Sequence, residues 1–92
     1  MFKKNGIRIQ KIERANDFIP LVDCKVGDRV EISEIDAGRG AALNLASLGL
    51  HIGNIIRLGR RSPFKGPLTV EHQGSEIAIG FGLAEKILVT KV

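Results

Sequence analysis

The candidate ligands for a transition metal in this sequence are Cys24, His51, Glu71 and His72. None of them has the close spacing that is typical of a metal-binding motif. The parity of His72 with the apolar residues before it predicts a strand-end histidine that is partly covered. His51 is expected in a solvent-facing turn, and Cys24, the only cysteine, is expected to be an ordinary buried thiol. Binding of a transition metal such as iron is an open alternative, but the residues define no metal site and indicate no cofactor.

A basic cluster borders a loop that contains two prolines, Pro63 and Pro67. Its members are Arg57, Arg60, Arg61 and Lys65, with Phe64 as the only aromatic side chain among them. A nucleic-acid surface usually interleaves several aromatic side chains for base stacking, so this pattern disfavours nucleic acid. A rigid loop that presents one aromatic residue beside positive charges is typical of a surface that docks an acidic protein partner. The alternative is a solvated hairpin end without a partner.

No grouping of residues indicates catalysis, because the sequence has no Ser-His-Asp arrangement in motif form, no paired carboxylates on a recognisable scaffold and no Walker-type loop. Gly38-Arg39-Gly40 precedes a helical segment, where an anion could bind to the helix N-terminus. Two glycines at such a place more often only relieve a tight turn from strand to helix. We therefore expect a protein that is not an enzyme.

The net charge of +4 on 92 residues is unevenly placed. Residues 1–18 carry five basic and two acidic side chains, a net of +3, whereas residues 23–36 carry five acidic and two basic ones, a net of −3. The basic leader, residues 1–18, is expected to be a flexible tail or a docking strand, and residues 19–92 form the domain. The leader has no apolar run long enough for a signal peptide or a membrane span, so we expect a cytoplasmic protein.

The elements that position these residues are mostly strands. Alternation of apolar and polar residues predicts a strand over 30–35, followed by a helix over 41–48 whose apolar face includes Leu45. Gly49 is expected to end this helix in a left-handed conformation, with Leu50 packing back on Leu45 in a Schellman motif. One short helix after the first strand therefore interrupts the pattern.

The second half of the chain reads as further strands. Alternation predicts strands around Ile56–Leu58 and over 68–73, a tight hairpin at 73–76, and a strand that places Ile77, Ile79 and Phe81 on one face. A single helical turn at 82–85 precedes a last strand over 87–92. About five short strands with two helical pieces favour a mainly β fold, a small closed or nearly closed barrel, because closure removes exposed strand edges.

The ordered set of these pieces resembles the ferrous iron transport protein A (FeoA) family. The resemblance extends from Pro20 to Val92 and is most specific in Leu45-Ala46-Ser47-Leu48-Gly49-Leu50 followed by Gly53. It continues through Ser62-Pro63, Gly66-Pro67-Leu68, Gly74 and Ile77-Ala78-Ile79 to the end of the chain. The sequence departs from the family pattern at Asn44, at Ile52, where a proline is common, and at Gly80, where an arginine is usual.

The resemblance implies an SH3-like barrel and a non-catalytic accessory protein that binds the cytosolic region of a membrane ferrous-iron transporter of the FeoB type. We expect the contact surface to include Arg60, Arg61, Phe64 and Lys65, with Leu48 and Leu50 near the end of the helix. The two leucines are equally candidates for the core. The same barrel occurs in iron-dependent repressors, so the alternative is a stand-alone module that senses metal or acts with a repressor.

Overall fold

The computed structural model describes residues 18–92. The described part of the chain begins with β1 (Ile19–Pro20) and a short 3-10 turn, η1 (Leu21–Asp23). It continues through β2 (Arg29–Ile35), α2 (Arg39–Ser47), β3 (Ile55–Arg61), β4 (Leu68–His72), β5 (Ser75–Ile79), α3 (Phe81–Ala84) and β6 (Ile87–Lys91). The predicted order of strand, short helix, strands, helical turn and last strand is therefore confirmed.

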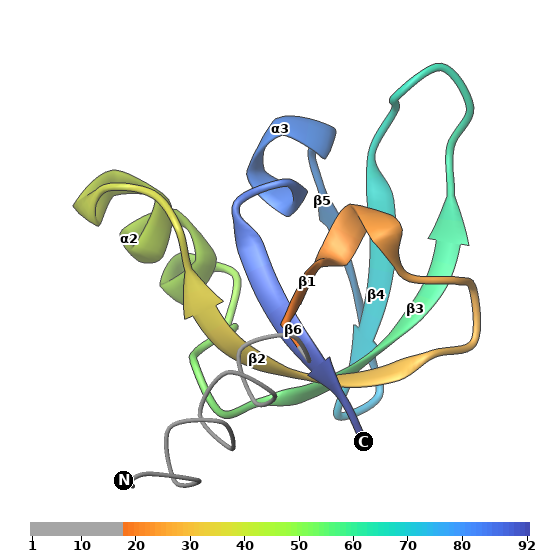
Figure 1. Cartoon of the computed structure of the whole chain (residues 1–92), viewed down its shortest axis with the longest axis horizontal. Helices are drawn as coiled ribbons and strands as arrows, with labels where there is room; N and C mark the ends of the chain where they lie inside the picture. Colours follow the sequence, from red (N-terminus) through yellow and green to blue (C-terminus); the bar gives the residue numbers. More distant parts are fainter. Residues whose placement is uncertain (1–17) are drawn as a thin grey trace, which may run out of the picture.

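All the strands belong to one curled antiparallel sheet with the order β1-β6-β2-β3-β4-β5 (Figure 1). The pairing register shifts between Ile32 and Glu34 in β2 and between Leu58 and Arg60 in β3. Such bulges bend a strand and increase its twist, which helps the sheet to curl around a single core. Between residues 18 and 92 no strand pairing joins β1 to β5, so the barrel is nearly closed rather than closed by hydrogen bonds.

The core fills the inside of this curled sheet, and α2 and α3 each contribute a buried residue to it. It consists of one cluster of buried side chains: Leu21, Cys24, Val30, Ile32, Leu45, Leu50, Ile56, Leu58, Leu68, Val70, Ile79, Ala84, Ile87 and Val89. Alternate residues of the central strands point inward, as the sequence pattern predicts. Among the described residues, no helix is long and apolar enough to cross a membrane.

Helix α2 ends as the sequence predicts. Gly49 has φ +87°, its N–H donates to the Ala46 carbonyl at 2.9 Å, and the N–H of Leu50 donates to the Leu45 carbonyl at 2.9 Å. These two bonds are those of a Schellman motif, and they turn Leu50 back into the core. The helix begins at Arg39, two residues before the predicted start, because Gly38 is already its extended N-cap residue.

Two expectations need correction, and a third concerns residues outside the described part of the chain. The sheet has a sixth strand, β1, whose two residues are too few to produce a periodic pattern. Phe81 begins α3 instead of ending a strand, because the chain turns at Gly80, the N-cap of that helix. The leader falls almost entirely on residues 1–17, which lie outside the described part of the chain, so its role stays a prediction.

The turn before β2 predicts an acid sensitivity. Asp28 Oδ2 accepts a hydrogen bond from the Lys25 N–H at 2.9 Å and lies 3.6 Å from Lys91 Nζ, and both contacts lower the pKa of Asp28. A carboxyl with a lowered pKa in the folded state stabilises the fold above its unfolded pKa of about 4, and the contribution disappears as pH falls through the folded value.

Urea unfolding measured between neutral pH and acid should therefore show a loss of stability in the wild type that Asp28→Asn lacks. Glu85→Gln, which removes an exposed carboxylate without these contacts, serves as the control and should follow the wild-type curve. Parallel curves for the wild type and Asp28→Asn would contradict the assignment.

Candidate docking surface

The loop between β3 and β4 projects from one end of the molecule, away from α2 (Figure 1). Two backbone hydrogen bonds close it: Ser62 N–H donates to the Pro67 carbonyl and Gly66 N–H to the Pro63 carbonyl, each at 3.1 Å. Gly66 is required here, because a Cβ atom at this position would lie 2.7 Å from Ser62 Cβ. The loop is therefore a defined tip at the end of the hairpin.

The two residues at the tip have an unusual backbone conformation. Phe64 and Lys65 both have φ +58°, the sign that a type I′ turn requires at its two central residues. This turn favours Asn-Gly, and a residue with a Cβ atom in the left-handed region costs about 1–3 kcal/mol. The β4–β5 hairpin uses Gln73 and Gly74 at the equivalent places, with a glycine at the second. The backbone of the tip is therefore strained, and an Asn-Gly pair at these two positions would be less strained.

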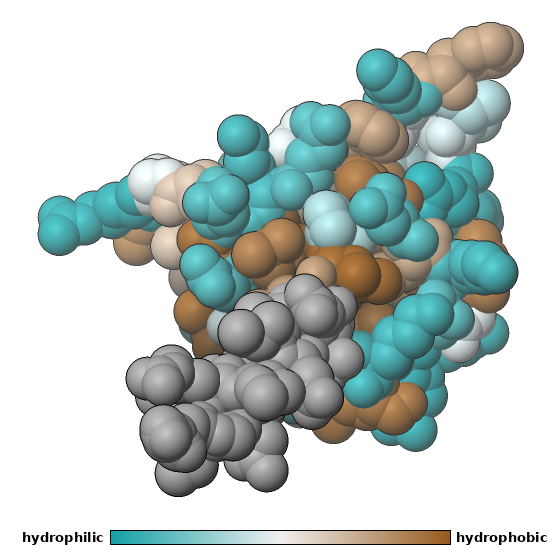
Figure 2. Space-filling model, in the orientation of Figure 1, coloured by the Kyte–Doolittle hydropathy of each residue, from teal (hydrophilic) through white to brown (hydrophobic). Residues whose placement is uncertain are grey.

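The strained turn presents an aromatic ring to solvent. Phe64 is 100% exposed, whereas the other large exposed apolar side chains of residues 18–92 keep part of their surface covered. Figure 2 shows an apolar surface at the far end of this projecting loop, beside hydrophilic side chains. A ring that is fully exposed on such a turn has little packing within the domain, so its exposure makes the tip a candidate contact surface.

The predicted contact residues are only partly brought together. Arg60 lies at the base of the loop with its Nη2 atom 3.5 Å from Glu76 Oε1, and both side chains are well exposed. Lys65 Nζ lies 6.0 Å from the centre of the Phe81 ring. Arg60, Phe64 and Lys65 all belong to the end of the β3–β4 hairpin, and the three are called the hairpin tip below. Leu50 is buried in the core, and Leu48 is exposed at the end of α2, on another part of the molecule.

Arg61 is used within the fold. Its guanidinium donates to the Cys24 carbonyl at 2.8 Å and to the Val22 carbonyl at 2.7 Å, so it ties η1 and the turn after it to the base of the hairpin. The planar guanidinium can reach both carbonyls at once, which a lysine ammonium on a flexible stem does less well. Arg61 therefore positions the hairpin rather than offering a free charge.

Arg61→Lys is expected to lower the free energy of unfolding by about 1–2 kcal/mol, because a bond to a charged donor is lost and a carbonyl is left without its partner. The Cys24 thiol beneath this turn should then react faster with a disulfide reagent. Arg60→Lys is the matched control, because its exposed ion pair contributes less than about 1 kcal/mol. Equal unfolding midpoints and thiol rates for the two variants would contradict the role of Arg61.

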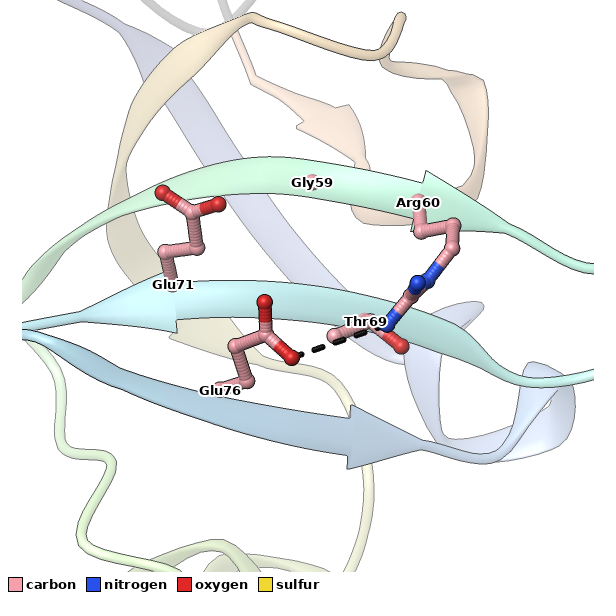
Figure 3. Close-up of a pocket in the computed structure, with 5 residues that line it drawn as sticks. All are labelled: Gly59, Arg60, Thr69, Glu71 and Glu76. Carbon is pink, nitrogen blue, oxygen red and sulfur yellow. Dashed lines mark ion pairs between the residues drawn. The ribbon is translucent and has the colours of Figure 1, made fainter.

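A small hollow of about 90 Å³ lies on the outer face of β3, β4 and β5, beside the arginine at the base of the hairpin tip (Figure 3). It opens where Gly59 has no side chain, and Glu71 and Glu76 stand directly opposite each other across β4 and β5. Arg57 Nη1 lies 2.9 Å from Glu71 Oε1, and Arg60 pairs with Glu76. The two carboxylates are thus compensated by arginines, which offsets the repulsion of like charges on neighbouring strands.

Each of the four candidate metal ligands has a different environment in the structure. His72 Nδ1 lies 3.2 Å from the Ile55 carbonyl oxygen, Glu71 pairs with arginine, and His51 is exposed in a turn, as predicted. Cys24 is buried, and burial, followed by the charge of Asp28, raises the pKa of its thiol. Within residues 18–92, no three histidine, cysteine or acidic side chains come together in a metal-binding arrangement.

One surface was missed by the sequence analysis. An apolar groove of about 450 Å³ runs between α2 and the segment that follows it, and its lining includes Leu43 and Ile52. Leu43 lies off the face of α2 that packs on the core, and Ile52 is one of the two positions after Asn44 at which the sequence departs from the pattern expected from the family resemblance. These two deviations were the only signals of the groove in the sequence.

A curled sheet of short strands, with one inserted helix and a projecting hairpin, defines a small SH3-like domain. The FeoA domain model matches residues 19–91, and the chain belongs to the FeoA domain family. The expected family resemblance is confirmed.

Three individual proteins illustrate the likeness. A protein of Methanocaldococcus jannaschii described as "Putative Fe(2+) transport protein A" is 44% identical over 70 residues, which cover 76% of this chain and 83% of that protein. A crystal structure of an iron uptake regulatory protein (FeoA) matches with a TM-score of 0.75 and 33% identity, over 82% of this chain and 99% of the other. A manganese-dependent transcriptional repressor matches with a TM-score of 0.74 and 25% identity, over 82% of this chain but 42% of the repressor.

Proposed function

We propose that this protein is a non-catalytic accessory protein of ferrous-iron transport, which acts in the cytoplasm and binds the cytosolic region of a FeoB-type transporter. The observation that carries the proposal is the fully exposed Phe64 on a strained turn. Membership of the FeoA family supports a role in ferrous-iron transport, because the similar M. jannaschii protein is named for Fe(2+) transport. Phe64 inserts into an apolar pocket of the partner, and Arg60 and Lys65 face acidic residues at its rim.

The electrostatic pattern of the domain supports a protein partner. The acidic side chains of residues 23–36 and the basic hairpin tip lie on different segments of a domain whose overall charge is close to neutral. Complementary charges at the rim of an interface speed association and fix orientation, whereas a central aromatic side chain supplies most of the affinity. The hairpin tip has both features within a few residues.

The test uses the full chain and the purified cytosolic region of the transporter, without nucleotide, with GDP and with a GTP analogue. We expect binding in at least one nucleotide state, weakened at least about tenfold by Phe64→Ala. Val26→Ala removes another exposed apolar side chain, 55% exposed in a distant turn, and should leave binding unchanged. Absence of binding in every state, or equal effects of the two substitutions, would refute the proposal.

The likeness to a manganese-dependent repressor favours a second candidate, a module that senses metal or acts with a repressor. It predicts direct binding of Fe²⁺, Mn²⁺ or Zn²⁺ that is lost in His51→Ala or His72→Ala. Calorimetric titration of the full chain with each metal separates the two candidates, because the transporter proposal requires no such loss.

A further inference from the structure

The apolar groove beside α2 is a second candidate binding surface, separate from the hairpin tip. Its lining residues are Ile35, Arg39, Ala42, Leu43, Ala46, Leu50, His51 and Ile52. Leu43 and Ile52 remain 63% and 61% exposed, so the groove is open along its length in the free protein. Figure 2 shows apolar side chains gathered at the base of the projecting helix.

The charge in the lining of the groove favours a negatively charged ligand. Arg39 is the one lining residue with a permanent charge, and no carboxylate is among the lining residues. Arg39 is also the first residue of α2, whose N-cap is Gly38, a residue without a side chain that could cap the helix. The positive end of the helix dipole therefore lies at the end of α2 at which Arg39 joins the lining of the groove.

We propose that this groove docks an amphipathic segment of a partner protein, one that carries carboxylates beside its apolar face. The apolar side chains of the segment cover Leu43 and Ile52, and a carboxylate pairs with Arg39 at the start of α2. Helix-in-groove recognition uses such a combination of apolar anchors and a charged end. The basic leader is a poorer occupant, because its net charge of +3 has the same sign as the charged group of the groove.

The first experiment adds two short peptides to the isotope-labelled full chain. Both have leucines along one helical face, and they carry either glutamates or lysines on the other face. We expect the glutamate peptide to shift the amide resonances of α2 and residues 50–52, and to bind about five to ten times more tightly than the lysine peptide. Equal affinity of the two peptides, or shifts confined to the hairpin tip, would overturn the proposal.

Variants locate the contact. Leu43→Asp and Ile52→Asp should each abolish binding of the glutamate peptide, whereas Val26→Asp, an equally exposed apolar position outside the groove, should not. Arg39→Glu should reverse the preference in favour of the lysine peptide. Because these side chains are exposed, all four variants are expected to keep the wild-type circular dichroism spectrum.

Two further outcomes would assign the groove to another occupant and so overturn the proposal. The first is a concentration-dependent sedimentation coefficient that Ile52→Asp abolishes, which would mean that a second copy fills the groove. The second is an increase in peptide affinity after deletion of residues 1–17, which would mean that the leader fills it. None of these measurements involves the transporter, so the groove and the proposed function can fail separately.

Discussion

Replacing Phe64 by asparagine together with Lys65 by glycine is expected to stabilise the free protein and at the same time to weaken its binding to the transporter region. Both residues have φ +58° in the native turn, and Asn-Gly is the pair that this type of turn favours. Relief of the two unfavourable conformations should raise the free energy of unfolding by about 1–2 kcal/mol. Loss of a central aromatic contact should weaken binding by at least about 2 kcal/mol, roughly thirtyfold.

The single variant Lys65→Gly separates the two effects. It relieves the strain at one position and keeps the aromatic ring, so it should gain part of the stability and lose little affinity. Urea unfolding gives the stability of each variant, and calorimetric titration with the transporter region gives the affinity. A double variant that binds as tightly as the wild type would mean that the strained turn has no part in recognition, and a less stable one would mean that the turn is not strained.

The strands and the helix could be predicted from the sequence because each has a pattern of its own. The alternation of Val30 and Ile32 with polar residues predicted β2, and the positions of Leu45, Gly49 and Leu50 predicted the end of α2. One element, β1, and one boundary, the start of α3, were beyond such reasoning. A strand of two residues, β1, has no period, and Phe81 continues the strand alternation although the chain turns at Gly80.

The candidate surface was harder to predict than the fold, because an arginine in a sequence does not show what its guanidinium contacts. Arg60 and Arg61 are neighbours of the same type, but one is exposed beside Glu76 whereas the other donates to two backbone carbonyls almost forty positions earlier. The exposure of Phe64 was predicted from the prolines and glycine around it. Its positive φ was not, because nothing in the residue type indicates a left-handed conformation.

The largest loss of stability is expected for Leu45→Ala. Leu45 is the one fully buried residue of α2, a helix of nine residues that is too short to be stable without tertiary packing. Removing its side chain leaves a cavity next to the Leu50 side chain, which the Schellman motif turns toward the same core. Such truncations cost about 2–5 kcal/mol, a large part of the 5–15 kcal/mol typical of a small domain.

Leu43→Ala removes the same atoms from the same helix at a position that is 63% exposed, and should change the free energy of unfolding by no more than about 0.5 kcal/mol. Urea unfolding measures both variants, and amide hydrogen exchange in α2 should speed up only in Leu45→Ala, because only there does the helix lose its anchor. Leu45→Ala should also weaken binding of the glutamate peptide, because α2 forms one wall of the groove. Binding through the hairpin tip should be unchanged in this variant. Equal destabilisation by the two substitutions would mean that α2 is held through its outer face, and the groove would then belong to the core rather than to a partner.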